Sequence, residues 1–193
     1  YISVTGVQTC ALPIFSDVFN SMIGEVFGTK KSKYMVIYLP NSGKEVQYHL
    51  EGTVEVIPKD DPPTTTSKTD YLTYSYLDSY GQPKDSTYKF SYTLFNATYG
   101  VQIRIHAKLM KGATLTKSFD FEKGFSEEGH FRSVPGLLPT NVISYRFPAS
   151  FSSLPKTDSL NRPSITQKAI QTAVDSLVDK VLETIDTEAP PTL

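Results

Sequence analysis

The sequence predicts an α+β fold: a mostly antiparallel sheet of five to seven strands, with a short N-terminal helix and a long C-terminal amphipathic helix packed on it. Three observations lead to this prediction. The chain is rich in strand-favouring aromatic residues, with 12 Tyr and 11 Phe. Apolar and polar residues alternate through its middle. A broad apolar stripe at helical spacing lies near its end. Helices that bury one stripe beside an antiparallel sheet form a two-layer domain.

The first 14 residues differ from the rest and hold the only cysteine, Cys10. Residues 4–14, VTGVQTCALPI, resemble residue for residue a common sequencing-library adapter translated in frame. We therefore expect residues 1–14 to be a non-native segment, which is excluded from the fold prediction, and the native gene to be truncated before Phe15. The alternative is a genuine N-terminal strand. The remaining chain holds no cysteine, and hence no disulfide or thiolate site.

The rest of the chain has the length of one domain. We expect a single α+β domain over residues 15–187 and a disordered tail at residues 188–193. The net charge is −1, so no overall field steers nucleic acid to the chain. No run of 18 apolar residues is present, and no membrane span is expected. The low share of charged residues, 20%, with many Ser, Thr and Tyr, favours a β-rich protein outside the cytoplasm.

The first native elements are a helix and two strands. Apolar spacing predicts the helix from Ser16 to Gly28, with Gly28 in the left-handed position past its end. Residues 34–39 form a continuous apolar run of strand length. Alternation over residues 45–57 predicts a long strand with one polar face. Gly52 falls on the apolar face of that strand, where close packing is expected.

The middle of the chain predicts a loop followed by short strands. Residues 58–69 hold three prolines and no large apolar residue, which predicts a mobile loop. A strand is expected at residues 71–80. A three-stranded meander follows, with one turn at residues 96–100 and another at Lys111-Gly112. Its strands are expected at residues 88–94, 101–109 and 115–121.

The last part of the chain predicts one strand and the longest helix. Residues 123–140 have no regular pattern, and residues 142–147 suit a final strand. The apolar stripe from Ile165 to Ile185 predicts a helix about 30 Å long. Ser164 and Gln167 have the spacing of a capping box at its start.

No sequence motif predicts catalysis. His49, His106 and His130 each stand alone, without the spacing of a metal site. The chain contains no nucleophile elbow, P-loop or dinucleotide-binding glycine pattern. We therefore expect no catalytic residue, no metal site and no cofactor. A site assembled in space from a histidine and a carboxylate stays open as the alternative.

Two groups of residues are candidates for a ligand or partner surface. Arg104, His106 and Lys108 share one strand face. A basic face can bind nucleic acid or an anionic lipid surface. No aromatic residue is interleaved on this face, so it serves base stacking poorly. We therefore favour a solvated outer sheet face and expect no nucleic-acid partner.

The second group is a tyrosine cluster formed by Tyr71, Tyr74, Tyr76 and Tyr80. Tyrosines combine an apolar ring with a polar tip, which suits a sugar-binding or protein-binding platform. Packing within the sheet is the simpler interpretation of the same pattern.

The layout resembles that of bacterial envelope lipoproteins of the assembly and transport-auxiliary type. The resemblance covers most of residues 16–186: a helix precedes a strand at 48–54, a hairpin follows at 103–121, and a long amphipathic helix ends the chain at 165–185. It implies binding or scaffolding rather than catalysis, a location in the cell envelope, and another envelope protein or membrane-associated complex as partner. It also implies membrane contact only through an N-terminal anchor that is lost here.

We therefore expect a non-enzymatic extracytoplasmic binding or scaffolding domain from a truncated envelope lipoprotein. Two alternatives remain. One is a hydrolase with a spatially assembled site. The other is a surface adhesion or carbohydrate-binding module that uses the tyrosines of residues 71–80.

Overall fold

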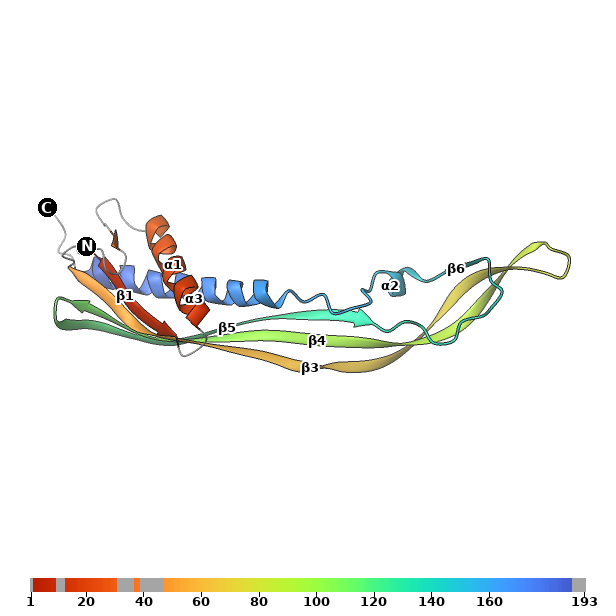
Figure 1. Ribbon diagram of the computed structural model, residues 1–193, viewed down its shortest axis with the longest axis horizontal. Coiled ribbons are helices and arrows are strands. Elements are labelled where there is room, and N and C mark those ends of the chain that lie inside the picture. The colour runs from red at the N-terminus through yellow and green to blue at the C-terminus, as the bar shows by residue number, and fades with distance from the viewer. Residues whose placement is uncertain (1, 10–12, 31–36, 39–46, 189–193) are drawn as a thin grey trace. The chain divides into compact units, whose positions relative to one another are not determined.

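The computed structural model describes residues 2–9, 13–30, 37–38 and 47–188 (Figure 1). It is an α+β protein with an antiparallel sheet and a C-terminal helix, as the sequence predicts. The chain divides into two compact units. Unit 1 comprises residues 1–59, 100–126 and 162–193, and unit 2 comprises residues 60–99 and 127–161.

The sheet is built on three long consecutive strands. Its order is β2-β1-β3-β4-β5, and β6 pairs antiparallel with β3 at residues 73–75. β1 pairs in parallel with both β2 and β3. The bounds are β1 Ile2–Thr9, β2 Ile37–Tyr38, β3 Tyr48–Leu77, β4 Pro83–Lys111, β5 Thr114–Arg132 and β6 Ser144–Arg146.

β1 lies in the segment that we interpret as adapter-derived. It pairs with β3 over residues 48–54, with a register shift between Val4 and Val7. Its origin stays a prediction, because backbone pairing does not distinguish native from foreign sequence. Of the strand expected at residues 34–39, only β2 falls within the described residues. The tail expected at 188–193 lies outside them except for Glu188, which ends a helix.

The predicted loop at residues 58–69 is wrong, because these residues belong to β3. Among the described residues, β1 and β6 pair with β3 only at residues 48–54 and 73–75, so no described strand pairs with the outer edge of the intervening stretch. Prolines are tolerated at such an edge, since no ladder bond is lost there. Within unit 2, the Thr64 hydroxyl donates to the Asn96 carbonyl oxygen of β4 at 3.5 Å, which joins the two strands.

The predicted turn at residues 96–100 is also wrong, since β4 continues through it. Phe90 is buried at an even position, whereas Ala97, Tyr99 and Val101 are buried at odd positions. One extra residue within a continuous strand has this effect, because the side chains that follow it point to the opposite face of the sheet. The segment expected to be irregular from residue 123 is likewise strand up to Arg132, while β6 confirms a strand within residues 142–147.

Unit 1 places two helices on the sheet. α1 (Pro13–Lys30) packs against α3 (Arg162–Glu188), which lies along the strands of this unit (Figure 1). α3 starts before the expected cap Ser164, and α1 extends past Gly28, which has no left-handed backbone. The predicted stripe of α3 is buried, and so are alternate residues of β4: Val101, Ile103, Ile105, Ala107 and Leu109.

The close packing predicted at Gly52 is confirmed. A β-carbon at this position would lie 2.2 Å from the His106 carbonyl oxygen and 2.7 Å from the Ala107 Cα. β3 and β4 therefore approach so closely that only glycine fits at residue 52.

Unit 2 has its own core. Leu72, Phe90 and Phe151 form its buried cluster, and Phe151 comes from the short helix α2 (Ala149–Ser152). The Phe90 and Phe151 rings meet edge to face with centroids 5.1 Å apart, a favoured aromatic geometry. Residues packed around this cluster are Tyr74, Tyr88, Tyr92, Leu138 and Phe147.

Among the described residues, no helix has the length and apolar character needed to cross a bilayer.

Candidate functional site

The predicted basic face lies on the outer surface of unit 1. Arg104, His106 and Lys108 alternate with the buried residues of β4, so their side chains point away from α3. The structure thus brings these three residues together as predicted. It also brings acidic residues of β3 and β5 beside them, which changes the charge of the surface.

Arg104 is held between two carboxylates. Its Nη1 lies 3.3 Å from Glu55 Oε2 on β3, and its Nε lies 2.9 Å from Glu122 Oε2 on β5. Gln102 also donates to Glu122. The hydrogen bonds from Arg104 and Gln102 hold the pKa of Glu122 below its ordinary value, and the same pairing raises the pKa of Arg104.

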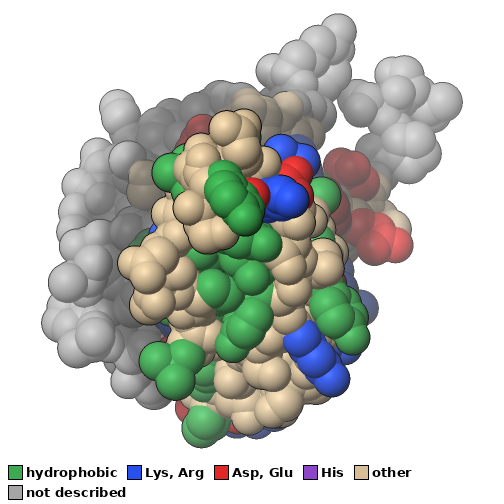
Figure 2. Space-filling model, turned by 90° about the vertical axis from the view of Figure 1, so that its right-hand side faces the viewer, with side chains coloured by type: hydrophobic (Ala, Val, Ile, Leu, Met, Phe, Trp, Pro, Cys, Tyr) green, Lys and Arg blue, Asp and Glu red, His purple; other side chains and the backbone are tan. Residues whose placement is uncertain are grey.

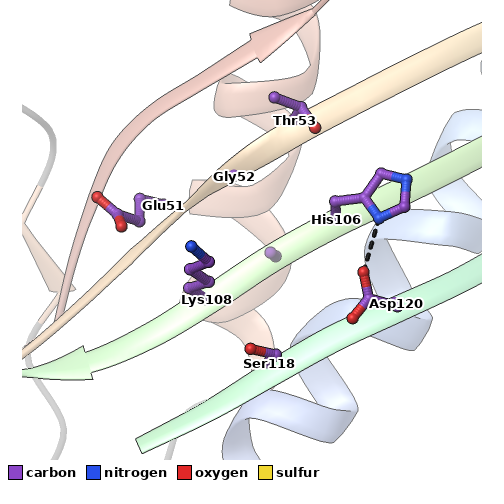
Figure 3. Close-up of a pocket in the computed structure, with 8 residues that line it drawn as sticks. Glu51, Gly52, Thr53, His106, Lys108, Ser118 and Asp120 are labelled. Carbon is purple, nitrogen blue, oxygen red and sulfur yellow. Dashed lines mark hydrogen bonds and ion pairs between the residues drawn. The ribbon is translucent and has the colours of Figure 1, made fainter. Parts of the chain in front are cut away.

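His106 pairs with one carboxylate in an open hollow. Its Nδ1 lies 2.6 Å from Asp120 Oδ1, and both side chains are 65% exposed. The hollow has a volume of about 400 Å³ (Figure 3). Ser118 lines the hollow but lies apart from the imidazole, so the pair has no serine nucleophile at hand. Its other labelled residues are Glu51, Gly52, Thr53 and Lys108.

The outer face is therefore a mixed-charge surface. Two permanent cations, Arg104 and Lys108, stand beside four carboxylates, which gives a formal charge of −2 with His106 neutral. The four carboxylates belong to Glu51, Glu55, Asp120 and Glu122. A phosphate-rich ligand is not attracted to a face with this formal charge. The charge therefore favours the interpretation of this face as a solvated outer surface.

The pair of His106 and Asp120 includes neither of the other two histidines. His49 is half-buried on β3, and His130 in unit 2 has its Nδ1 2.7 Å from Asn96 Oδ1. In the part of the chain that the structure describes, no group of three or more His, Cys, Asp or Glu side chains could hold a metal ion.

The tyrosine cluster does not form one platform. Tyr74 and Tyr76 point to the same face as buried Leu72, with their ring centroids 5.8 Å apart. Tyr71 points to the opposite face and is 60% exposed. Tyr74 packs against the core of unit 2, which agrees with sheet packing rather than with a flat binding surface.

An exposed apolar cluster in unit 2 was missed by sequence reasoning. We call it the hairpin cluster. Figure 2 shows hydrophobic side chains gathered on the side of the molecule that faces the viewer. Its most exposed members are Leu137, at 95%, and Tyr80, at 85%. The full cluster is Tyr80, Leu137, Ile143 and Tyr145. A signal was present in the sequence, since Leu137 and Ile143 stand in a Gly/Pro-rich stretch where loop residues are usually polar.

Hydrogen bonds bring the two segments of the hairpin cluster together. The Ile143 amide donates to the Ser75 carbonyl oxygen at 2.7 Å. The Tyr88 hydroxyl donates to the Leu137 carbonyl oxygen at 3.3 Å. Tyr145 on β6 pairs with Tyr74 on β3. The segment around residues 137–145 is therefore fixed beside the β3–β4 hairpin.

Asp78 builds the turn that presents Tyr80. Its Oδ1 accepts the amides of Tyr80 at 2.9 Å and Gln82 at 3.0 Å, and its carbonyl oxygen accepts the amide of Gly81 at 3.0 Å. Gly81 has a φ of 74°, which glycine adopts without strain. The turn is thus locked from within, and the Tyr80 ring points outward.

No model of a known protein family matches this chain, and no curated protein matches its sequence.

Proposed function

We propose that the chain is a non-catalytic binding or scaffolding domain that engages an apolar partner surface through the hairpin cluster. The observation that carries this proposal is the exposure of four large apolar side chains on a hydrogen-bonded frame. Contiguous exposed apolar patches on soluble proteins mark interaction sites. The Ser- and Tyr-rich composition and the lipoprotein-like layout support a location in the cell envelope.

The frame matters as much as the exposure. Tyr80 comes from the β3–β4 hairpin, whereas Leu137 and Ile143 come from a segment far away in sequence. The two segments are tied by backbone and tyrosine hydrogen bonds. A fixed arrangement of apolar side chains loses less entropy on binding than a mobile one.

The two alternatives have less support. A hydrolase would draw on His106 and Asp120, but that pair is largely exposed and Ser118 lies apart from it. A carbohydrate platform would need the tyrosines on one face, whereas Tyr71 and Tyr74 lie on opposite faces of β3.

Site-specific photo-cross-linking tests the proposal. A photoreactive phenylalanine analogue replaces Tyr80 or Leu137 in the full chain, which is then irradiated in cells that carry the gene. The matched control carries the analogue at Leu115 in unit 1, an apolar residue that is 51% exposed. We expect adducts from Tyr80 and Leu137 but not from Leu115. Equal labelling at all three positions, or none, overturns the proposal.

A further inference from the structure

We propose that the hairpin cluster inserts into the interface of a lipid bilayer. This inference rests on the proposed function, in which the hairpin cluster is the binding surface. It adds that the partner is lipid and that the contact is made by unit 2. Three features of the hairpin cluster favour lipid over a protein partner: how far its side chains protrude, how its polar groups are satisfied, and where its charges lie.

The hairpin cluster protrudes rather than lining a groove. Tyr80 and Leu137 are 85% and 95% exposed, so almost nothing in the chain covers them. A rigid protein partner needs a matching socket for each such side chain, whereas a fluid bilayer adapts to both. Tyrosine is enriched at the membrane interface, because its ring enters the apolar layer and its hydroxyl stays with the headgroups.

The polar backbone of the turn is satisfied within unit 2. Asp78 accepts three backbone amides of the turn. Its Oδ1 accepts those of Tyr80 and Gln82, and its carbonyl oxygen accepts that of Gly81. The Asp78 amide in turn donates to the Gln82 carbonyl oxygen at 2.9 Å. Unsatisfied backbone groups are costly in lipid, so a turn that enters the bilayer must bond its own amides.

The second segment of the hairpin cluster shows the same feature. The Leu137 carbonyl oxygen accepts the Tyr88 hydroxyl, and the Pro139 carbonyl oxygen accepts the Tyr145 hydroxyl. These bonds cover carbonyl groups beside the most exposed leucine. A site that binds a polar protein surface has no need of such internal bonds, because the partner can donate to these carbonyl oxygens.

The charges near the turn suit a headgroup layer. The Asp78 side chain is only 20% exposed and is directed back into the turn, with Lys84 Nζ 3.7 Å away. Asp85 accepts the Ser75 hydroxyl at 2.5 Å. Lys84 and exposed Arg146 carry long side chains whose charged ends can reach lipid phosphates. These two cations balance the two carboxylates, so we expect binding to zwitterionic vesicles, with a modest increase when anionic lipid is added.

A tryptophan reporter tests the inference. The chain has no Trp, so Tyr80→Trp introduces a single reporter at the turn. Leu115→Trp is the matched control in unit 1, at a side chain that is 51% exposed. Each variant of the full chain is titrated with phosphatidylcholine vesicles, with and without phosphatidylglycerol, and with brominated lipid as quencher. We expect a saturable blue shift and quenching for Trp at 80 but not for Trp at 115.

A second substitution checks that insertion uses the whole hairpin cluster. Adding Leu137→Ser to Tyr80→Trp should weaken vesicle partition about tenfold, since one buried leucine side chain is lost from the contact. Leu137→Trp repeats the measurement from the other segment if Tyr80→Trp fails to fold. The far-ultraviolet spectrum reports folding of each variant.

The outcomes separate this inference from the proposed function. No blue shift with either vesicle overturns lipid insertion. A blue shift that follows protein concentration without lipid also overturns it, because the occupant is then a second copy. If position 80 gives protein adducts but vesicles cause no blue shift, the proposed function stands and lipid insertion does not. If position 80 gives no adducts and the protein binds no vesicles, both proposals are overturned.

Discussion

The guanidinium carbon of Arg132 lies 3.6 Å from the centroid of the Phe151 ring, and its Nε donates to the Phe151 carbonyl oxygen at 2.9 Å. Arg132 is only 7% exposed. The planar guanidinium thus stacks on the ring and bonds to the backbone of the same residue, which fixes α2 against β5.

Arg132→Lys should destabilise the protein by about 2 kcal/mol, because a lysine keeps the charge but loses the stacked planar contact and the Nε bond. Urea unfolding followed by circular dichroism measures the change. Arg146→Lys is the matched control on exposed β6 and should change the unfolding free energy by less than about 0.5 kcal/mol. Equal changes in both variants would contradict a structural role for Arg132.

Gly52→Ala should be strongly destabilising, by about 2 kcal/mol or more, because the new β-carbon would meet the backbone of His106 and Ala107. Gly28→Ala is its control, since a β-carbon there meets nothing within 4 Å and the residue lies inside α1. That substitution should stabilise the protein by up to about 1 kcal/mol. Thermal unfolding compares the two, and a tolerated alanine at residue 52 would show that β3 and β4 are not so close.

Glu122→Gln should reduce the loss of stability in acid. The folded protein holds the pKa of Glu122 below its ordinary value through Arg104 and Gln102. Its contribution is therefore present above the unfolded-state pKa of about 4.3 and is lost as the pH falls through the lower folded value. The thermal midpoints of the two proteins should differ at neutral pH and converge in acid.

Arg104→Gln provides the control for this prediction, because Arg104 is the largest cause of the lowered pKa. It should remove most of the same acid-dependent component. A constant offset between Glu122→Gln and the parent from neutral pH to acid would count against the pairing.

Residues 64–69 should show the hydrogen exchange of a strand. One edge of this stretch faces β4, while no described strand pairs with its other edge, so protected and unprotected amides should alternate. Exchange measured amide by amide by NMR distinguishes this pattern from the uniform rapid exchange of a mobile loop. The side-chain contact of Thr69 with Ser91, at 3.4 Å, supports the strand.

Much of unit 1 could be predicted from local patterns. The stripe from Ile165 to Ile185 and the alternation around Leu50 each report one buried face directly. The same reasoning failed at Pro62 and Pro63, since these prolines break a strand only where their missing amide would have been bonded. It also predicted a turn at residues 96–100, where β4 in fact continues and its buried positions change from even to odd.

The candidate sites show the limit of a single strand pattern. Alternation placed Arg104 and His106 on one face correctly, but it said nothing of Glu55 or Asp120. Which residues lie opposite depends on strand register, and register is set by long-range pairing. The hairpin cluster was missed for the same reason, because Tyr80 and Ile143 are brought to one region only by the folded chain.

The central claim is that the hairpin cluster serves binding and not folding. The combined variant Leu137→Ser and Ile143→Ser tests it most directly, with the photoreactive residue kept at position 80. Both replaced side chains are more than half exposed, at 95% and 58%, so the thermal midpoint should hardly change. The measurement is the yield of adduct from position 80. We predict a fall of about tenfold or more in a protein that stays folded, and an unchanged yield would contradict the claim.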